Sequence, residues 1–390
     1  MRFSPPVACA IMLILSIVLV SGCANPRGYA LLDPAVAQTP ISDEARLRTV
    51  FVATTRARSS EPGYFFSGRR SQTEGFARVL VSIPPVHEPG KLERPRRGPV
   101  DPAIHFAARE VRIFETGSEF ARSVRSDVAD GGDRVLVFVH GYNTRFAEAV
   151  CRVSQIAQDA DYDGAVVLFT WASAGRLVDY VYDQNSASAA RDSLEETLRM
   201  LAGTGAKRID LIAHSMGNWV ALEALRQLAI SGDRDLGGKL GDVVLAAPDV
   251  DLDVFRSQMA RYGTPGKPFF VMVSGDDRAL DLSRFIAGNR PRLGGDYADA
   301  GQIAELGLIV VDVTSVSGGD SLNHTKFADN PVLVRLLGDR LRDDSSLGAD
   351  ERGVEDRLDT LARGVGQTLA STAEIVITTP VEVLKVAVGQ

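Results

Sequence analysis

The stretch that decides the fold is IDLIAHSMGN, residues 209–218. Its first half is an apolar run typical of a buried strand, and it passes directly into a small-x-Ser-x-Gly pattern followed by helical periodicity. A serine on such a tight strand-to-helix turn projects its hydroxyl from the edge of a sheet, and small residues flank it because a larger Cβ would collide with neighbouring backbone. Ala213 takes the place of the first glycine of the usual pattern, which still fits sterically. We therefore predict that Ser215 is a nucleophile.

Strand and helix patterns alternate around this stretch. The early strands resemble an antiparallel opening, whereas the later ones are continuously apolar, as in parallel strands buried on both faces. The pattern predicts strands at 48–53, 76–83, 111–114, 134–139, 165–169, 208–213, 243–247, 269–274 and 309–313, and helices at 145–160, 187–201 and 216–230. The expected fold is therefore of the α/β class, with a mostly parallel, doubly wound sheet, helices on both faces and antiparallel N-terminal strands.

Two backbone N–H groups are candidates for an oxyanion hole. Met216 begins the helix after Ser215, where the N-terminus presents N–H groups and the positive end of the helix dipole. The sequence His140-Gly141-Tyr142-Asn143 follows the strand at 134–139, and the loop in that position supplies the second donor. We predict that the N–H groups of Tyr142 and Met216 form the hole, and that His140 is a structural residue that holds the loop.

The general base is identified by elimination. The chain order expected for this kind of site is serine, then acid, then histidine. Of the five histidines, His324 alone follows Ser215, since His214 is its immediate neighbour and the others lie earlier. His324 comes just beyond the last predicted strand, so we assign it as the base, against the alternative of a surface histidine without a catalytic role.

The acid has several candidates. Asp276 and Asp277 follow the strand at 269–274, where a carboxylate could reach the second imidazole nitrogen and fix its tautomer. Asp277 is preferred, although it could instead cap a helix that starts there. Asp249 and Asp251 follow the preceding strand and are the competitors.

Several motifs together resemble a known family. The residues are similar to bacterial α/β-hydrolases grouped as domain of unknown function 900, within the esterase/lipase superfamily. The motifs are FVATTR (51–56), VSIP (81–84), HGYN (140–143), AHSMG (213–217), APD (247–249), SGDDRAL (274–280) and the late His324. The resemblance covers roughly residues 48–341 and implies an α/β-hydrolase fold with a Ser-His-Asp triad. Its acid motif favours Asp277, but it supplies no substrate.

The N-terminus has the pattern of a signal peptide. The apolar run 7–20 follows Arg2 and is short for a membrane-spanning helix. It ends in Val-Ser-Gly-Cys at 20–23, which resembles the lipobox of bacterial lipoproteins and implies cleavage before Cys23 and its lipidation. Ala24 after the cysteine favours, by that analogy, the outer membrane. The alternative is a plain secretory signal in which the cysteine is incidental.

These patterns divide the chain into a signal peptide (1–22), a tether (23–46), an α/β-hydrolase domain (47–342) and a C-terminal helical tail (343–390). The tail combines helical periodicity over 354–369 with an apolar stretch, 375–388, that Pro380 interrupts. We expect the tail to dock on the domain or, alternatively, to serve in membrane-surface binding or self-association. Within the domain, Trp171 and the tyrosines after it are either packing or substrate-contact residues.

Composition narrows the classes of function. A formal net charge of −7 without a basic stripe argues against a nucleic-acid partner. The three cysteines form no metal-ligand cluster, and no glycine loop indicates a nucleotide, so we expect neither metal nor cofactor.

The expected function is a serine hydrolase of carboxylic esters, acting on a small-molecule or acyl substrate at the cell envelope. The alternatives are a peptidase, thioesterase or acyltransferase using the same triad, or a non-catalytic envelope-anchored scaffold. The sequence contains no feature that indicates the oligomeric state.

Overall fold

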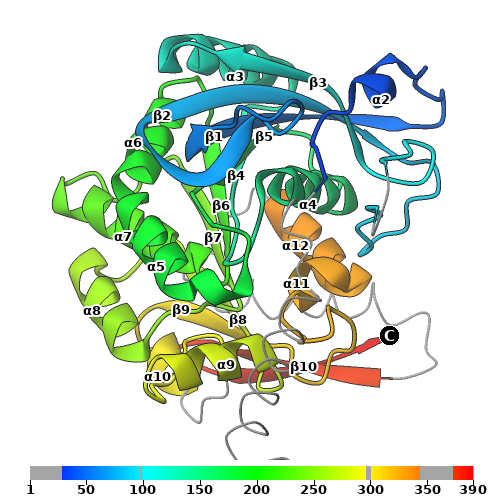
Figure 1. The fold of residues 1–390 in the computed structure, drawn as a ribbon. Helices are drawn as coiled ribbons and strands as arrows, with labels where there is room; N and C mark the ends of the chain where they lie inside the picture. The colour runs from blue at the N-terminus through cyan, green and yellow to red at the C-terminus, as the bar shows by residue number, and fades with distance from the viewer. Residues whose placement is uncertain (1–28, 96–98, 296–299, 343–371, 390) are drawn as a thin grey trace, which may run out of the picture.

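A twisted sheet runs through the molecule (Figure 1). The computed structural model describes residues 29–95, 99–295, 300–342 and 372–389. The 11-stranded sheet has the order β11-β10-β9-β8-β7-β6-β4-β5-β1-β2-β3. Neighbours from β9 across to β1 are parallel, and both edges are antiparallel. The strands are β1 (Arg46–Arg58), β2 (Phe66–Ile83), β3 (Ala107–Phe114), β4 (Arg134–Val139), β5 (Ala165–Thr170), β6 (Arg208–His214), β7 (Leu240–Ala246), β8 (Phe269–Val273), β9 (Leu308–Asp312), β10 (Thr372–Thr378) and β11 (Val383–Gly389).

Helices cover both faces of this sheet, and each face has its own apolar core. One core joins the sheet to α3, α5, α6, α7, α8 and α10, and the other joins it to α4, α11 and α12. The helices are α2 (Pro34–Gln38), α3 (Gly117–Asp130), α4 (Phe146–Asp159), η1 (Leu177–Asp179), α5 (Tyr180–Ala189), α6 (Arg191–Ala202), α7 (Gly217–Ile230), α8 (Leu252–Tyr262), α9 (Arg278–Ile286), α10 (Ala300–Ala304), α11 (Lys326–Asp329) and α12 (Pro331–Arg342). The predicted fold class, a mostly parallel doubly wound sheet with antiparallel N-terminal strands, is confirmed.

Some elements differ from the sequence-based expectation. Strand β2 begins well before residue 76, because its first half pairs with an extension of β1, as in the pair Arg56 and Arg70. The helix expected at 187–201 is two helices, α5 and α6, which meet at Ala190. Helix α3 was not expected, although Thr116 caps its N-terminus and three apolar side chains recur along its buried face.

The predicted tether, 23–46, is shorter than expected within the described part of the chain. Leu31 and Val36 are buried against the domain, and α2 lies beside β3. Asp33 caps α2 by accepting a hydrogen bond from the N–H of Ala35. The chain from about residue 29 onward is therefore part of the folded domain, because two apolar side chains in this polar segment find places in its core. Cys23 and the signal-peptide pattern lie outside the described residues.

The predicted helical tail, 343–390, is wrong for its last part. Residues 372–389 form an antiparallel hairpin, β10–β11, and β10 extends the sheet by pairing with β9. Ile375 and Ile377 alternate inward and are buried, as β-branched residues of period two do in a strand. Pro380 lies in the turn that reverses the chain. The helix expected over 354–369 lies outside the described residues. In the ranges that are described, no helix combines the length and apolar character that crossing a bilayer requires.

Candidate active site

Ser215 occupies a strained turn between β6 and α7. Its φ is +54°, a left-handed conformation that non-glycine residues rarely adopt. Hydrogen bonds to the end of β7 hold the turn in place. The N–H of Ser215 donates to the carbonyl of Ala246, and the Asn218 side chain donates to the carbonyls of both Ser215 and Ala246. The strand-to-helix turn expected from the sequence is therefore present.

Two glycines allow the loop after β4 to lie directly against this turn. A Cβ on Gly141 would be 2.7 Å from the Cβ of Ser215, and a Cβ on Gly217 would be 2.4 Å from the carbonyl oxygen of His140. Neither contact can be made by a real side chain. The close approach brings the backbone of Tyr142, which follows Gly141, to the neighbourhood of Ser215. Met216 is the N-cap of α7. The two predicted oxyanion donors thus come from segments in mutual contact.

Asp183 on α5 holds the β4–α4 loop that contains Tyr142. Its buried carboxylate accepts hydrogen bonds from the N–H of Asn143 at 3.2 Å, the N–H of Ala174 at 2.7 Å and the hydroxyl of Ser173. Burial raises the pKa of Asp183, and these three donors partly offset that effect. One carboxylate therefore fixes two loops that border the site, a role not indicated by the sequence.

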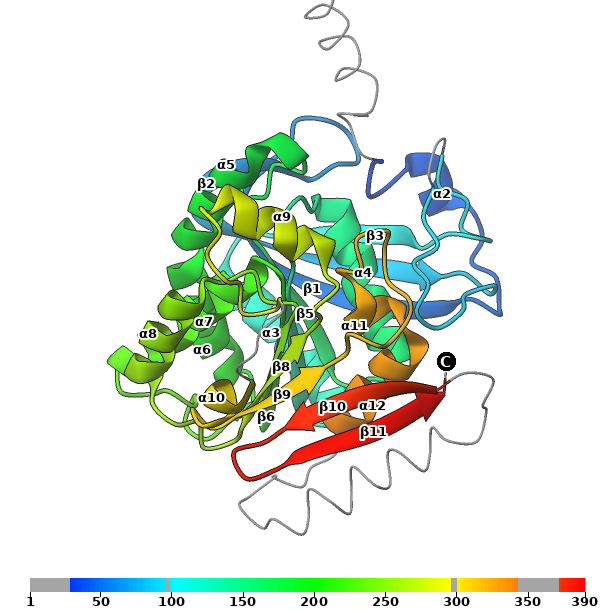
Figure 2. The same ribbon diagram turned by 90° about the horizontal axis from the view of Figure 1, so that it is seen from below.

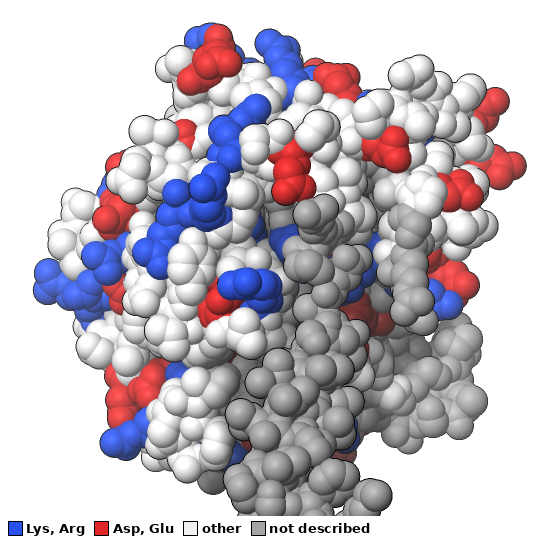
Figure 3. Space-filling model, viewed as in Figure 1, with Lys and Arg blue, Asp and Glu red and all other residues white. Residues whose placement is uncertain are grey.

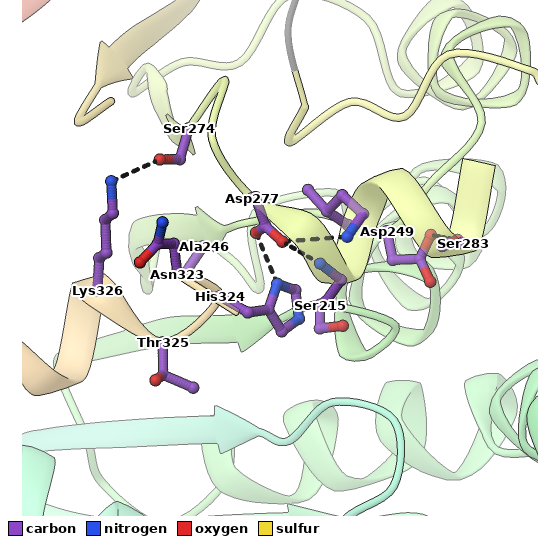
Figure 4. A network of polar contacts seen from close by, with 12 residues as sticks. Ser215, Ala246, Asp249, Ser274, Asp277, Ser283, Asn323, His324, Thr325 and Lys326 are labelled. Carbon is purple, nitrogen blue, oxygen red and sulfur yellow. Dashed lines mark hydrogen bonds and ion pairs between the residues drawn. The ribbon is translucent and has the colours of Figure 1, made fainter. Parts of the chain in front are cut away.

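Asp277 and His324 form a direct pair at the same end of the sheet (Figure 4). The Nδ1 of His324 lies 2.6 Å from Oδ2 of Asp277, while the other oxygen of that carboxylate accepts from the N–H groups of Ala279 and Leu280 at the start of α9. Asp277 thus caps α9 with one carboxylate oxygen and pairs with His324 through the other. Figure 4 draws Ser215 and His324 with no hydrogen bond marked between them, so what relates the two residues is the packing of His214, the residue before Ser215, against the ring of His324.

The environment of His324 favours its protonated form. Burial alone would lower the pKa of His324, but the hydrogen bond and negative charge of Asp277 outweigh it, and the pKa is raised from its ordinary value. The ring of His214 packs against the ring of His324, with the two ring centroids 4.7 Å apart. Burial and the nearby His324 lower the pKa of His214 well below its usual range, so His214 is neutral, and its Nε2–H donates to the carbonyl of His324.

The competing carboxylates have other partners. Asp276 accepts hydrogen bonds from Lys326, Ser274 and Asn323, and burial of the carboxyl is outweighed by these donors, so its pKa is lowered. Asp251 caps α8. Asp249 accepts a hydrogen bond from Tyr180 at 2.9 Å and pairs with Arg292 at 3.3 Å. Only Asp277, among these four, is bonded to His324.

Arg56 is a buried organiser of the loops around the site. Its guanidinium donates to the hydroxyl of Thr170 at 2.7 Å and to the carbonyls of Ser173 at 2.9 Å and Thr144 at 2.7 Å. Its Nη2 also lies 3.3 Å from Nε2 of His140. Burial lowers the pKa of Arg56 to about 10, so it stays charged near neutral pH. An arginine at the end of an apolar strand, in FVATTR, was the available sequence signal, but the sequence did not indicate its partners.

His140 and Trp171 form the layer beneath the loop. Burial, with Arg56 nearby, lowers the pKa of His140 to about 3, so its ring is neutral and Nδ1–H donates to the carbonyl of Gly141. Trp171 stacks on that ring, is fully buried, and donates from Nε1 to the carbonyl of His140 at 2.8 Å. His140 therefore has the structural role expected for it, and Trp171 is a packing residue.

No three His, Cys, Asp or Glu side chains within the described ranges are arranged to hold a metal ion. Cys151 is buried on α4, and burial raises the pKa of its thiol to about 11. A thiol with such a pKa is a poor nucleophile near neutral pH, which leaves Ser215 as the candidate.

Comparison with known families places the chain among the hydrolases of this fold. Residues 115–340 match the model of a family described as alpha/beta hydrolase of unknown function (DUF900). The chain belongs to this family. The match spans β4 to β9, together with the segments that carry Ser215, Asp277 and His324. No curated protein matches the sequence.

Solved structures of esterases align with this DUF900 hydrolase at low identity. An esterase from the fungus Rhizomucor miehei aligns at 10% identity over 79% of this chain and 86% of that chain, with a TM-score of 0.39. Two structures of an esterase from Pyrobaculum calidifontis align at 12% identity and a TM-score of 0.35, over 79% and 88% of this chain and 88% and 98% of theirs.

Proposed function

We propose that the protein is a serine hydrolase of carboxylic esters, with Ser215 as nucleophile, His324 as general base and Asp277 as the acid that orients it. The observation that carries the proposal is the 2.6 Å contact between His324 Nδ1 and Asp277 Oδ2, together with the strained turn of Ser215, whose neighbour His214 packs against the ring of His324. A carboxylate on one ring nitrogen leaves the other free to accept a proton from a serine hydroxyl. That arrangement supports acyl transfer.

In this mechanism Asp277 keeps the Nδ1–H tautomer of His324, so that Nε2 is the basic nitrogen. Nε2 takes the proton of Ser215 as Oγ attacks the ester carbonyl. The N–H groups of Met216 and Tyr142 stabilise the negative charge that develops on the carbonyl oxygen. The protonated His324 then gives its proton to the departing alcohol, and water releases the acyl group from Ser215 with the same base.

We also propose that the hydrolase works at the bacterial cell envelope, held by a lipid on Cys23 at the periplasmic side of the outer membrane. The support is the apolar run at 7–20 that ends in a lipobox-like Val-Ser-Gly-Cys, and Ala24 after the cysteine. Mass spectrometry of the mature protein tests it: diacylglycerol or triacyl mass on Cys23 is expected, and a chain that starts elsewhere or carries no lipid contradicts it.

A panel of p-nitrophenyl esters of increasing chain length tests the reaction. We expect turnover of at least some esters, a loss of roughly a million-fold in Ser215→Ala and a similar loss in His324→Ala, because the residues act as a unit. Cleavage of amide or thioester analogues in preference to the esters would replace the ester assignment by a peptidase or thioesterase. Absence of all turnover in the folded protein would favour the scaffold alternative.

A further inference from the structure

We propose that the surface next to the Ser215 site docks on a bilayer that contains anionic lipid, and that the substrate is an acyl ester resident in that bilayer. The proposal rests on the ester-hydrolase function above and names its substrate class. It is argued from exposed apolar side chains, from charge and from the course of the N-terminal chain.

Six large apolar side chains are exposed on two neighbouring segments. We call them the apolar rim: Leu177, Val178 and Val181 on η1 and α5, and Leu282, Phe285 and Ile286 on α9. Val178 is 83% exposed and Phe285 is 71% exposed. Single exposed apolar residues are ordinary, whereas a group of them on adjoining helices indicates a surface that binds something apolar.

The apolar rim borders the Ser215 site on two sides. Tyr180, between Val178 and Val181, donates to Asp249 and lies 2.8 Å from the hydroxyl of Ser283 on α9, so the two halves of the rim are joined. Asp277, the partner of His324, is the N-cap of α9. The Tyr142 hydroxyl donates to the carbonyl of Leu177. Asp249, which accepts from Tyr180, donates its N–H to the carbonyl of Ser215, so the apolar rim is connected to the turn of the candidate nucleophile.

The charge around the rim suits an anionic surface. Arg176 and Arg284 are matched by Asp179 and Asp281, and exposed Arg69, Arg278 and Arg290 add positive charge. Figure 3 shows basic side chains gathered over the start of β2 beside α5. Apolar side chains flanked by arginine are the composition that binds an anionic bilayer interface.

The N-terminal chain reaches the domain on the same side. Leu32 contacts the tip of the β1–β2 hairpin at Gly63, and Gly68 on β2 packs against Ala174, just before η1. Figure 2 shows α5, α9 and the first described residues at one end of the molecule. Cys23 precedes Tyr29 by six residues, at most about 20 Å of extended chain. A lipid on Cys23 would hold this end, with its apolar rim, against the bilayer.

The test uses the full chain reconstituted in vesicles of phosphatidylcholine and phosphatidylglycerol, with Val178→Asp combined with Phe285→Asp. We expect the double variant to keep its turnover of water-soluble p-nitrophenyl acetate and to lose at least about tenfold on a fluorogenic long-chain acyl ester dissolved in the vesicles, since each apolar side chain buried in the interface is worth roughly a tenfold change in partitioning. The matched control is Val381→Asp with Val383→Asp on the β10–β11 hairpin, at 73% and 60% exposure, which should keep both activities.

Hydrogen exchange tests binding of the apolar rim to the bilayer independently of ester hydrolysis. In the wild type, vesicles should protect residues 176–182 and 278–287 whether or not any ester is cleaved, so a failure of the proposed function leaves this result readable. Full activity of the double variant on the vesicle ester, or no protection of these segments, would overturn the proposal. So would a dimer in vesicle-free solution that the double variant abolishes, because a second copy of the chain would then be the occupant of the rim.

Discussion

At the scale of single residues, Asp276 and Asp277 have different partners, and the proposed chemistry depends on that difference. The two side chains are adjacent in sequence, but one accepts from Lys326 and the other from His324. Their substitution therefore separates structure from catalysis within one dipeptide.

We expect Asp277→Asn to lower kcat by roughly ten-thousandfold, because the amide no longer holds the imidazole in the reactive tautomer. Asp276→Asn is the matched control: it leaves the buried Lys326 without its carboxylate, so we expect a loss of about 1–2 kcal/mol in the free energy of unfolding and little change in kcat. Steady-state kinetics and urea denaturation of both variants check the pair. The reverse pattern would move the acid to position 276.

The pH dependence follows from the raised pKa of His324. The base acts only when neutral, so kcat/KM should rise with pH through the pKa of His324, on a limb above the value of about 6.5 of an ordinary histidine. Asp277→Asn should move that limb to lower pH, because the stabilising charge is gone. His140 and His214 have lowered pKa values and are neutral throughout this range. A limb that is unmoved in the variant would exclude His324 as the titrating group.

Sequence reasoning assigned His324 as the base by elimination, and it preferred Asp277 as the acid without excluding three other aspartates. The reason is physical: Asp249, Asp251, Asp276 and Asp277 all follow strands of the same sheet edge, and the choice depends on where each side chain points. That direction is fixed by contacts remote in sequence, such as Lys326 to Asp276 and Tyr180 to Asp249. The local sequence pattern around each aspartate does not reveal these contacts.

At the scale of the elements, close packing of β4, β6 and the loops after them positions the site. Helix α7 and the β4–α4 loop touch at Gly141 and Gly217. Arg56, near the end of β1, donates hydrogen bonds to carbonyl groups of the surrounding loops. Substitutions at Gly141 and at Arg56 test these two sets of contacts.

Gly141→Ala should lower kcat about a hundredfold without unfolding the protein, because the added Cβ would be 2.7 Å from the Cβ of Ser215 and must displace the loop of the oxyanion donors. Gly301→Ala on α10, where an added Cβ meets nothing within 4 Å, is the control and should keep normal kinetics. Equal kinetics of the two variants would contradict the placement of the loop against Ser215.

Arg56→Ala should lower the free energy of unfolding by roughly 2–5 kcal/mol, since several buried acceptors lose their donor at once. Arg58→Ala, two positions farther along the same strand and exposed, should change it little. Guanidinium denaturation compares the two. A small effect at both positions would show that the acceptors of Arg56 find other donors.

The elements of the central sheet could be predicted because continuous apolar runs separated by turns leave few alternatives. The helix break at Ala190 and the long start of β2 could not, since both depend on packing partners. Loop contacts such as Asp183 to Asn143 join segments whose relation appears only in the folded chain.

At the scale of the whole molecule, the C-terminal hairpin completes one edge of the sheet. The expected helical tail extended to residue 390, but in its last part the alternating β-branched residues of β10 pair with β9 and bury Ile375 in the core. A two-stranded hairpin is marginal alone, so this one depends on the sheet that it joins.

Ile375→Ala should destabilise the protein by about 2–4 kcal/mol, the range for a buried isoleucine that leaves a cavity. Val383→Ala on β11 is exposed and should be nearly neutral. Thermal unfolding of the full chain checks both. Equal unfolding midpoints would show that the hairpin is not part of the cooperative domain.

The most direct test of the central claim is the site of reaction with a fluorophosphonate, located by mass spectrometry of peptides from the full-length protein. We predict one adduct per chain, on Ser215, that is absent in Ser215→Ala and forms far more slowly in Asp277→Asn but not in Asp276→Asn. An adduct on another residue, or no adduct on folded protein, would contradict it.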